Sequence, residues 1–450
     1  MFDRFLRLTE RAPGATAVIE ADSHRVVTRE ALIARAEELV RELAQAGVGA
    51  RDLVAVQLPN SAEFVATILA ASKLDLVIVP IDREAPPTEV ATILGHFSIG
   101  PLIYRGTGSP TYRAGQRTSP ALPPEARLIK LTSGSTGLPK GIVTSDANLV
   151  ADCTNICASM DIRPDDINFG AIPMSHSYGF SNLVMPLLVQ GTPVVMSNEY
   201  LPQSVIDLCN QYRCTVVPLI PMVFEHLSNL PHEDGTFATA RTFLSAGAPL
   251  PVATSRRFRE RFGEPIHSFY GCSECGGITY DRRGSAVERG SVGSALEQVE
   301  LSIESARLVV RSDSVALGYL HDASTFHPFE PRTFLTDDIV ELADGEVVLA
   351  GRVSDLINTA GKKVNPREVE QIILQMEGVR QVKVYGAPAG ARGDVVAAAI
   401  VASPDVTRDQ VRLYCAARIS PHKVPRIVKL IEQMPVDERG KITRAALATL

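Results

Sequence analysis

The sequence lacks tryptophan altogether, and it lacks the patterns that mark a membrane-spanning or exported chain. No stretch reaches the roughly 18 to 20 uninterrupted apolar residues that a membrane-spanning helix needs. Residues 1–14, MFDRFLRLTERAPG, have no apolar core of the kind found in signal peptides. These absences predict a cytoplasmic protein with no membrane span.

Regularly spaced cysteines and an excess of positive charge are also missing. Seven cysteines occur, and the CxxC pair of Cys272 with Cys275 has no second pair at a zinc-ribbon distance. We therefore expect reduced thiols, packed or exposed, rather than a metal site built from cysteine. The net charge of −6 argues against a nucleic-acid partner.

The length and the order of patterns indicate an α/β protein with two domains. At 450 residues, of which 45% are hydrophobic, the chain can form more than one domain and a sizeable core. Apolar runs such as 52–58 and 76–80 alternate with helical patterns, which is typical of a parallel sheet with helices on its faces. Short strand patterns follow from Gly290. We expect a large N-terminal domain of α/β layers with a small β-rich subdomain (1–352), joined by a hinge to a small α+β C-terminal domain (353–450).

Two helices have clear start signals. Thr28 is placed to cap a helix over residues 29–46, and Ser61 is placed to cap one that ends near Lys73. Residues 106–125 are rich in Gly, Ser, Thr and Pro, which predicts a linker.

The rest of the chain is organised around residues 126–145, ARLIKLTSGSTGLPKGIVTS. The central residues 132–141 hold three glycines, four hydroxyl side chains and Lys140. Glycine allows turns that expose backbone N–H groups, and many donors around one positive charge suit a polyphosphate. Pro139 precedes the lysine, so this is not the loop of P-loop NTPases, in which a helix begins at that point. The alternative is an ordinary surface loop.

Several strand patterns end in residues that suit a binding cleft. Ligand sites in open α/β sheets lie at the carboxyl ends of strands. The segments that end at His176, Pro221, Gly247 and Gly271 are therefore candidates to surround one cleft.

A hairpin is predicted around Asp344-Gly345, a strong two-residue turn signal. Counting outward gives the pairs Leu342–Val347, Val340–Leu349 and Asp338–Gly351. Asp338 and Arg352 then emerge side by side at the open end. A carboxylate beside a guanidinium suits two adjacent hydroxyls, such as those of a ribose, and the alternative is a surface ion pair.

Together these pieces resemble the adenylate-forming superfamily, which includes acyl-CoA synthetases, luciferases and the adenylation domains of peptide synthetases. The resemblance covers nearly the whole chain, and the motifs occur in the family's order. They are TSGSTGLPKG (132–141), PMSHSYGF (173–180), SAGAPL (245–250), YGCSE (270–274), GYL (318–320), TDD (336–338), GRVSD (351–355) and GKITR (440–444). Departures from the family's pattern are Ala246, Ser273, Asp337 and Ser354.

The resemblance implies a role for each matched residue. The catalytic residues would be Lys441, Glu274, Thr136 and His176, with Glu274 as the magnesium ligand. ATP would be bound by Thr132, Ser133, Gly134, Ser135, Thr136, Gly137, Lys140, Gly247, Ala248, Pro249, Tyr270, Gly271, Ser273, Asp338 and Arg352. The acyl pocket would include His176, Tyr178, Gly276 and Gly277. The thiol site would include Gly361 and Lys362, and the hinge would be Ser354.

The activity implied by the resemblance has two steps and uses ATP and Mg²⁺. A small carboxylic acid becomes an acyl-adenylate, and a thiol then displaces AMP. Between the steps, a rotation of the small domain would withdraw Lys441 and bring the turn at Gly361 to the cleft. Tyr178 and the lack of tryptophan fit aryl or medium-length aliphatic acids.

The thiol and the class of protein leave alternatives. Residues 351–370 are closer to acyl-CoA synthetases than to peptide-synthetase domains, which favours coenzyme A. No carrier segment follows Leu450, so a separate acyl carrier protein is the competing acceptor. A catalytically silent acyl- or nucleotide-binding protein of the same fold is the alternative from a different class.

Overall fold

The structure is a computed structural model, and it describes residues 1–105, 110–113, 122–132, 139–198, 201–231, 235–359, 362–388, 394–435 and 446–447. The chain forms two compact units, residues 1–301 with 310–334 and residues 302–309 with 335–450. The predicted domain boundary after residue 352 concerns which parts move together, and it stays a prediction.

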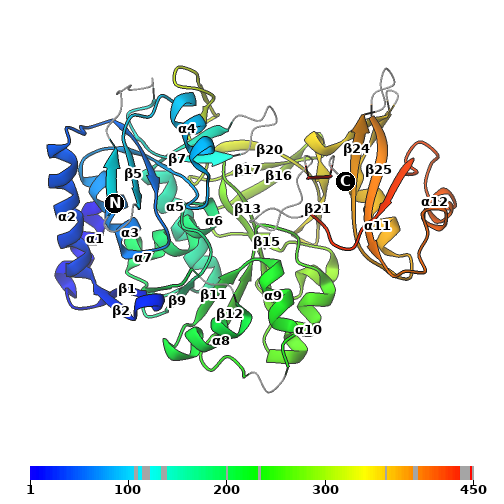
Figure 1. The fold of residues 1–450 in the computed structure, drawn as a ribbon, viewed down its shortest axis with the longest axis horizontal. Helices are drawn as coiled ribbons and strands as arrows, with labels where there is room; N and C mark the ends of the chain where they lie inside the picture. The colour runs from blue at the N-terminus through cyan, green and yellow to red at the C-terminus, as the bar shows by residue number, and fades with distance from the viewer. Residues whose placement is uncertain are drawn as a thin grey trace. The chain divides into compact units, whose positions relative to one another are not determined.

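The first unit alternates helices with strands (Figure 1). Its helices are α1 (Phe2–Arg11), α2 (Arg29–Gln45), α3 (Ala62–Lys73), α4 (Pro87–His96), α5 (Asp146–Met160), α6 (Ser177–Gly179), α7 (Met185–Gln190), α8 (Pro202–Gln211), α9 (Pro221–Ser228) and α10 (Val252–Phe262). Its strands are β1 (Thr16–Glu20), β2 (Arg25–Thr28), β3 (Leu53–Gln57), β4 (Val77–Pro80), β5 (Leu102–Arg105), β6 (Pro110–Arg113), β7 (Ala126–Thr132), β8 (Lys140–Ser145), β9 (Asn168–Gly170), β10 (Val194–Met196), β11 (Val216–Leu219), β12 (Thr242–Ser245), β13 (Ile266–Cys272), β14 (Gly276–Tyr280), β15 (Ser294–Ala295), β18 (Gly318–Leu320) and β19 (Phe326–Pro328).

Two sheets carry these strands. One runs in the order β15-β14-β13-β12-β11-β9-β10-β1-β2, and its neighbours from β13 to β1 are parallel. The other runs β19-β18-β8-β7-β4-β3-β5-β6, with β4, β3 and β5 parallel. In each sheet the central strands are parallel, and the antiparallel pairs lie toward the edges. Sheets with parallel centres and helices between their strands are the architecture predicted from the alternating patterns, so the α/β fold class is confirmed.

The helix starts and the aromatic core follow from local sequence. The Thr28 hydroxyl accepts a hydrogen bond from the N–H of Ala31, and Ser61 caps α3 in the same way, as predicted. Helices α9 and α10 lie side by side (Figure 1). Between them, the rings of Phe224 and Phe258 pack edge to face with centroids 5.3 Å apart. This ring pair belongs to a larger apolar cluster of aliphatic and phenylalanine side chains, to which α8 contributes Val205, Ile206 and Cys209.

The prediction of a linker over residues 106–125 is wrong for residues 110–113. These residues form β6, which pairs antiparallel with β5 and places Leu102 opposite Arg113. Their sequence, PTYR, contains the strand-forming residues Thr and Tyr, and the proline stands at the first strand position, where its missing N–H is tolerated.

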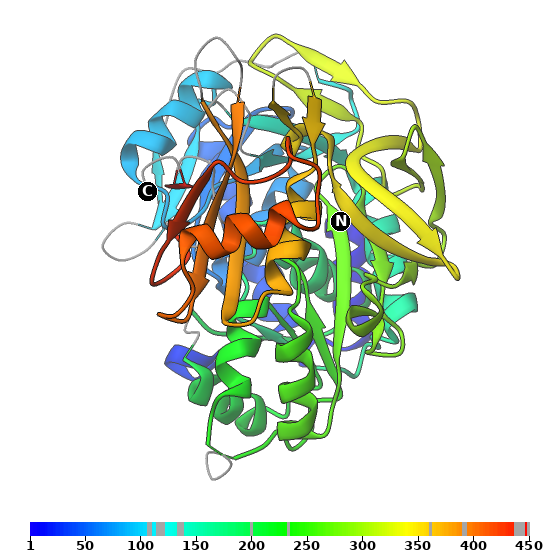
Figure 2. The same cartoon turned by 90° about the vertical axis from the view of Figure 1, so that its right-hand side faces the viewer.

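The second unit is built mainly from β16 (Glu300–Glu304), β17 (Arg307–Arg311), β20 (Thr333–Ala343), β21 (Glu346–Arg352), β22 (Ile357–Thr359), β23 (Lys362–Val364), α11 (Pro366–Leu374), β24 (Val379–Pro388), β25 (Asp394–Ala402), α12 (Arg408–Ala416) and β26 (Ile427–Leu430). Strands β24, β25 and β26 form one sheet. Figure 2 shows α11 and α12 against the same face of this sheet, and their buried residues share one apolar cluster with it. This is the small α+β unit expected near the C-terminus.

Within the described part of the chain, no helix has both the length and the apolar character needed to cross a bilayer. All seven cysteines are free thiols, and six of them are buried. Cys153 and Cys157 pack one helical turn apart on α5, with their sulfur atoms 3.9 Å from each other.

Candidate active site

The two ends of the predicted phosphate loop face each other across a strand pair. Thr132 lies opposite Lys140 in the antiparallel pair of β7 and β8, and the Thr132 hydroxyl donates to the Lys140 carbonyl at 3.4 Å. Five predicted loop residues lie outside the described residues: Ser133, Gly134, Ser135, Thr136 and Gly137. The structure therefore describes the two ends of the loop, Thr132 and Lys140, but not the residues between Thr132 and Pro139.

Glu274 lies in the turn between β13 and β14, and its side chain contacts Tyr319. The Tyr319 hydroxyl donates a hydrogen bond to Glu274 Oε1 at 2.7 Å. The Lys140 ammonium lies 5.6 Å from the centroid of the same ring. Strand β18 pairs with β8, which places Tyr319 opposite Ile142 and so brings it to the end of the loop.

The environment of Tyr319 keeps its hydroxyl protonated. Burial raises the pKa of Tyr319, and the neighbouring Glu274 carboxylate raises it further. The phenol is therefore a hydrogen-bond donor to this carboxylate well into alkaline pH. The GYL motif contained this residue, but its contact with Glu274 was not predicted, because the two segments are distant in sequence.

The chemistry of this site fits magnesium. A carboxylate is the hard oxygen ligand that Mg²⁺ prefers, and Mg²⁺ usually keeps several waters and substrate phosphate oxygens as its other ligands. No group of three or more His, Cys, Asp or Glu side chains suited to a metal occurs among the described residues. Glu274 is the carboxylate of this site that could hold the ion.

His176 is held by an acidic residue that the sequence analysis missed. His176 Nε2 lies 2.7 Å from Asp82 Oδ2, and the Glu84 N–H donates to Asp82 Oδ1 at 3.0 Å. Asp82 follows the carboxyl end of β4. The position of polar residues after parallel strands was a usable signal, and it would have found this one.

Three of the predicted motif segments contact one another. The hydroxyls of Ser177 and Ser273 lie 2.7 Å apart. The Tyr178 hydroxyl donates to the Leu244 carbonyl at 3.0 Å, at the end of the strand that leads to the exposed Gly247. Of the other predicted residues in that segment, Ala248 is half-buried and Pro249 is exposed. Burial raises the pKa of Tyr178, so its phenol is also a donor.

The glycines around Glu274 pack too closely for side chains. A Cβ on Gly271 would collide with the Gly276 carbonyl, and one on Gly276 would collide with the Asp152 carboxylate. The Gly277 N–H donates to Asp152 Oδ1 at 2.8 Å, and the Ser181 hydroxyl donates to Asp152 Oδ2 at 2.6 Å. The predicted acyl-pocket glycines therefore rest on a buried carboxylate of α5, while Tyr270 beside them is half-buried.

In the second unit, the predicted hairpin and its ion pair are present. Asp344 and Gly345 both have positive φ, as a two-residue turn of type I′ requires. Arg352 Nε donates to Asp338 Oδ1 at 2.8 Å. The predicted pairing of Asp338 with Gly351 is wrong by one residue, because a register shift after Ile339 places Asp338 opposite Arg352.

The hinge and thiol candidates are only partly described. The Ser354 N–H donates to Asp337 Oδ2 at 3.1 Å, so the side chain that departs from the family's TGD motif holds the chain just after β21. Lys362 is exposed at the start of β23. Gly361 and Lys441 lie outside the described residues.

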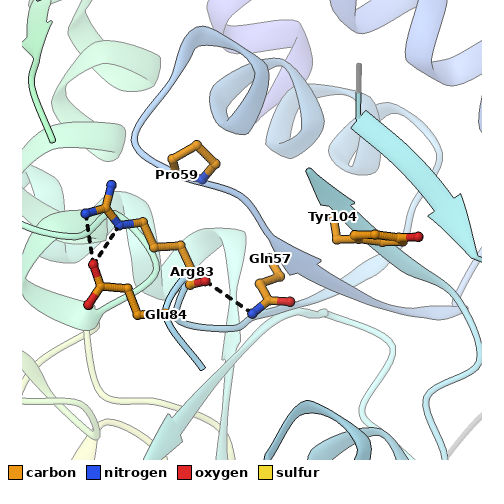
Figure 3. A pocket seen from close by; sticks show the side chains of 5 residues that line it. All are labelled: Gln57, Pro59, Arg83, Glu84 and Tyr104. Carbon is orange, nitrogen blue, oxygen red and sulfur yellow. Dashed lines mark hydrogen bonds and ion pairs between the residues drawn. The ribbon is translucent and has the colours of Figure 1, made fainter. Parts of the chain in front are cut away.

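A pocket of about 390 Å³ opens at the carboxyl ends of β3 and β5 and beside the segment after β4 (Figure 3). Its lining is Gln57, Pro59, Arg83, Glu84 and Tyr104. Arg83 pairs with Glu84 at 3.0 Å, and Gln57 Nε2 donates to the Asp82 carbonyl at 3.1 Å. None of the predicted site residues lines this pocket, although Asp82 connects it to His176.

Comparisons with known proteins identify the family and the fold. The AMP-binding enzyme family model matches residues 5–127 and 104–320, and the model of the AMP-binding enzyme C-terminal domain matches residues 368–441. The long-chain-fatty-acid–CoA ligase FadD13 of Mycobacterium tuberculosis is 25% identical over 97% of this chain and 95% of its own length. The sulfoacetate–CoA ligase of Cupriavidus necator is 27% identical over 97% of this chain and 94% of its own length.

A similar fold occurs in O-succinylbenzoate coenzyme A synthetase (MenE) from Bacillus subtilis in complex with ATP and magnesium ion. The TM-score is 0.81 at 23% identity, over 98% of each chain.

Proposed function

Because the chain belongs to the family of AMP-binding enzymes, we propose that it is an AMP-forming acid–thiol ligase that converts a small carboxylic acid and coenzyme A to an acyl-CoA. The observation that carries this proposal is the Glu274 carboxylate, which accepts a hydrogen bond from Tyr319 while Lys140, at the end of the phosphate loop, lies over the same ring. The relatives named as CoA ligases support it.

The first step joins the acid to the nucleotide. A carboxylate oxygen attacks the α-phosphorus of ATP, the bond to the bridging oxygen breaks, and pyrophosphate leaves with the electron pair. No general base is needed because a carboxylic acid is already ionised at neutral pH. Catalysis then depends on neutralising charge on the phosphoryl oxygens. Lys140 and the loop residues would bind the phosphates, and Lys441 would stabilise the transition state.

Glu274 would hold Mg²⁺ beside the phosphates, and Tyr319 would orient this carboxylate. The ion supplies positive charge to the triphosphate when it is bound. The complex of MenE with ATP and magnesium ion supports the presence of a magnesium ion with ATP in a protein of this fold. His176, oriented by Asp82, and Tyr178 would border the acid, and Asp338 with Arg352 would bind the ribose hydroxyls.

In the second step, the sulfur of coenzyme A attacks the acyl carbonyl carbon and AMP leaves. Gly361 and Lys362 would border the thiol. The seven reduced cysteines fit a reducing compartment such as the cytoplasm, where coenzyme A is also found.

The test is a pyrophosphate-release assay over a panel of carboxylic acids, with ATP, Mg²⁺ and coenzyme A each omitted in turn. We expect acid-dependent pyrophosphate release, and an acyl-CoA product by mass spectrometry only when coenzyme A is present. Transfer to a carrier protein but not to coenzyme A would change the acceptor. ATP binding without pyrophosphate release from any acid would indicate a silent binding protein.

A further inference from the structure

A buried lysine lies in the strand that leads into the phosphate loop. Lys130 is in β7, and only 6% of its surface is exposed. Its neighbour Ile129 belongs to the apolar cluster on one face of the sheet. Because side chains alternate along a strand, Lys130 projects to the opposite face. The charged and titratable groups around it there are Asp152 on α5, and Cys272, Glu274 and Cys275 at the turn between β13 and β14.

The ammonium of Lys130 has no partner among the described residues. An ammonium carries three donors, yet no hydrogen bond or ion pair of this side chain is present in the described part of the chain. A buried charge without a partner is unfavourable, and such groups are concentrated where a ligand supplies the missing contact. The strand therefore holds a cation whose donors are available to a bound molecule.

The alternative is that Lys130 has a purely structural role as the counter-charge to Asp152. This role accounts less well for a buried lysine without a hydrogen-bond partner. Each carboxylate oxygen of Asp152 already accepts a hydrogen bond, one from Gly277 and one from Ser181. Asp152 is the strongest source of opposite charge for Lys130, but the described residues show no ion pair between the two side chains. The same carboxylate packs against Gly276 and accepts a hydrogen bond from the Gly277 N–H. One of the charged groups that act on Lys130 therefore also supports the candidate acyl-pocket glycines.

We propose that Lys130 determines the acid specificity by binding a second oxyanion on the substrate, so that the preferred acids are dicarboxylates or sulfocarboxylates rather than plain alkyl or aryl acids. This inference depends on the proposed ligase function. One carboxylate of the substrate reacts with ATP, and the distal carboxylate or sulfonate accepts hydrogen bonds from the Lys130 ammonium. Oxyanions accept these bonds strongly because both partners are charged.

The charge of Lys130 is sensitive to pH. Burial lowers the pKa of Lys130, while the carboxylates of Asp152 and Glu274 act in the opposite direction. The Lys130 side chain carries a positive charge below its pKa and loses that charge as the pH rises through the pKa. As the pH rises, the preference for diacids should therefore disappear at a lower pH than the one at which an exposed lysine loses its charge.

The test compares pairs of acids in which a carboxylate replaces a terminal methyl group. The pairs are malonate with propionate, succinate with butyrate, and glutarate with valerate, and sulfoacetate is added as a sulfonate. For the native enzyme, we expect kcat/KM from pyrophosphate release to favour the diacid in at least one pair. In Lys130→Met the ratio of diacid to monoacid should fall roughly ten- to a hundredfold, with most of the change in KM for the diacid.

Two further measurements make the test independent of turnover and of folding. Lys73→Met, which removes an exposed lysine of α3, is the matched control and should leave the ratio unchanged. Diacids should raise the Tm of the native protein more than their monoacid partners do, and this difference should vanish in Lys130→Met. If Lys130→Met does not fold, the loss of diacid preference with rising pH in the native enzyme replaces it.

The outcomes separate this inference from the proposed function. Pyrophosphate release that favours the monoacid of every pair would overturn the role of Lys130 and leave the ligase function standing. An equal loss for diacids and monoacids in Lys130→Met would also overturn it, because a structural counter-charge predicts that result. No release with any acid, together with no difference in Tm, would overturn both.

Discussion

Two contacts of acidic side chains, one in each unit of the molecule, differ in how they arise. Asp338 and Arg352 are 14 positions apart and are joined by a single hairpin, whereas Glu274 and Tyr319 are 45 positions apart and come from different hairpins. The first contact follows from the geometry of one two-residue turn. The second depends on β18 pairing with β8, a long-range arrangement that no local pattern specifies. Local turn chemistry therefore predicts one contact and is silent about the other.

The two contacts also differ in exposure. The Arg352 side chain is 55% exposed beside an Asp338 side chain that is 9% exposed, and an ion pair so open to water contributes little stability. It can exchange its partner for ligand hydroxyls at small cost. Tyr319 is more enclosed, and burial raises its pKa. We therefore expect the hairpin pair to contact the ligand and the tyrosine to support a residue that does.

The largest effect is expected at Lys441, which belongs to neither contact. Lys441→Ala should slow adenylate formation by roughly 10²–10³, because a transition-state charge partner is lost. Thioester formation from supplied acyl-adenylate should stay nearly intact, since this cation would serve only the first step. Single-turnover assays of each half-reaction check this, with Lys429→Ala as the control. An equal loss in both steps would contradict the proposed domain rotation.

The second-largest effect is expected at Glu274. Glu274→Gln should lower the adenylation rate by about a hundredfold and shift the magnesium titration to higher concentration, because an amide is a poorer ligand than a carboxylate. Circular dichroism should show an unchanged fold, and Glu300→Gln, at an exposed position of β16, is the control. A magnesium titration identical to that of the native enzyme would mean that the ion is bound elsewhere.

Removal of the hairpin carboxylate should act on nucleotide binding. Asp338→Ala should raise KM for ATP by roughly ten- to a hundredfold, because a hydrogen bond to a charged group is lost, and it should change KM for the acid much less. Replacing ATP by its 2′,3′-dideoxy analogue should impair the native enzyme by a similar factor and the variant little. Equal impairment of both proteins would show that Asp338 does not contact the diol.

The smallest effect should come from the supporting tyrosine. Tyr319→Phe keeps the ring under Lys140 and removes the hydrogen bond to Glu274, which should raise the magnesium requirement by about two- to tenfold. Because the pKa of Tyr319 is raised, the difference between native and variant enzymes should persist to pH values above about 10, where an exposed tyrosine ionises. Tyr385→Phe, in the second unit, is the control. If the two proteins titrate identically with magnesium, Tyr319 does not orient Glu274.

The sequence predicted those features that depend on neighbouring residues. The caps at Thr28 and Ser61 and the turn at Asp344-Gly345 are present because each depends on a few adjacent positions. Counting along the hairpin failed by one residue at Asp338, since a bulge adds a residue to one strand without a clear signal.

The interior polar contacts could not be predicted in the same way. Asp82 contacts His176 from 94 positions away, and Lys130 is enclosed by elements that follow it in the chain. A charged residue between the apolar residues Ile129 and Leu131 was visible in the sequence. Its surroundings depend on how α5 and the turn before β14 pack on β7, so only the three-dimensional structure identifies them.

The close packing of the three glycines around Glu274 limits how this enzyme can change during evolution or in the laboratory. Any residue larger than glycine at Gly271 or Gly276 would displace the backbone or the Asp152 carboxylate, and Gly277 is enclosed by Leu296 and Phe269. The proposed acyl pocket therefore cannot be reshaped by enlarging Gly276 or Gly277. We expect changes of substrate range to arise on β7 and α5 instead. Libraries randomised at Lys130 and Asp152 should yield altered acid preference more often than libraries randomised at the glycines.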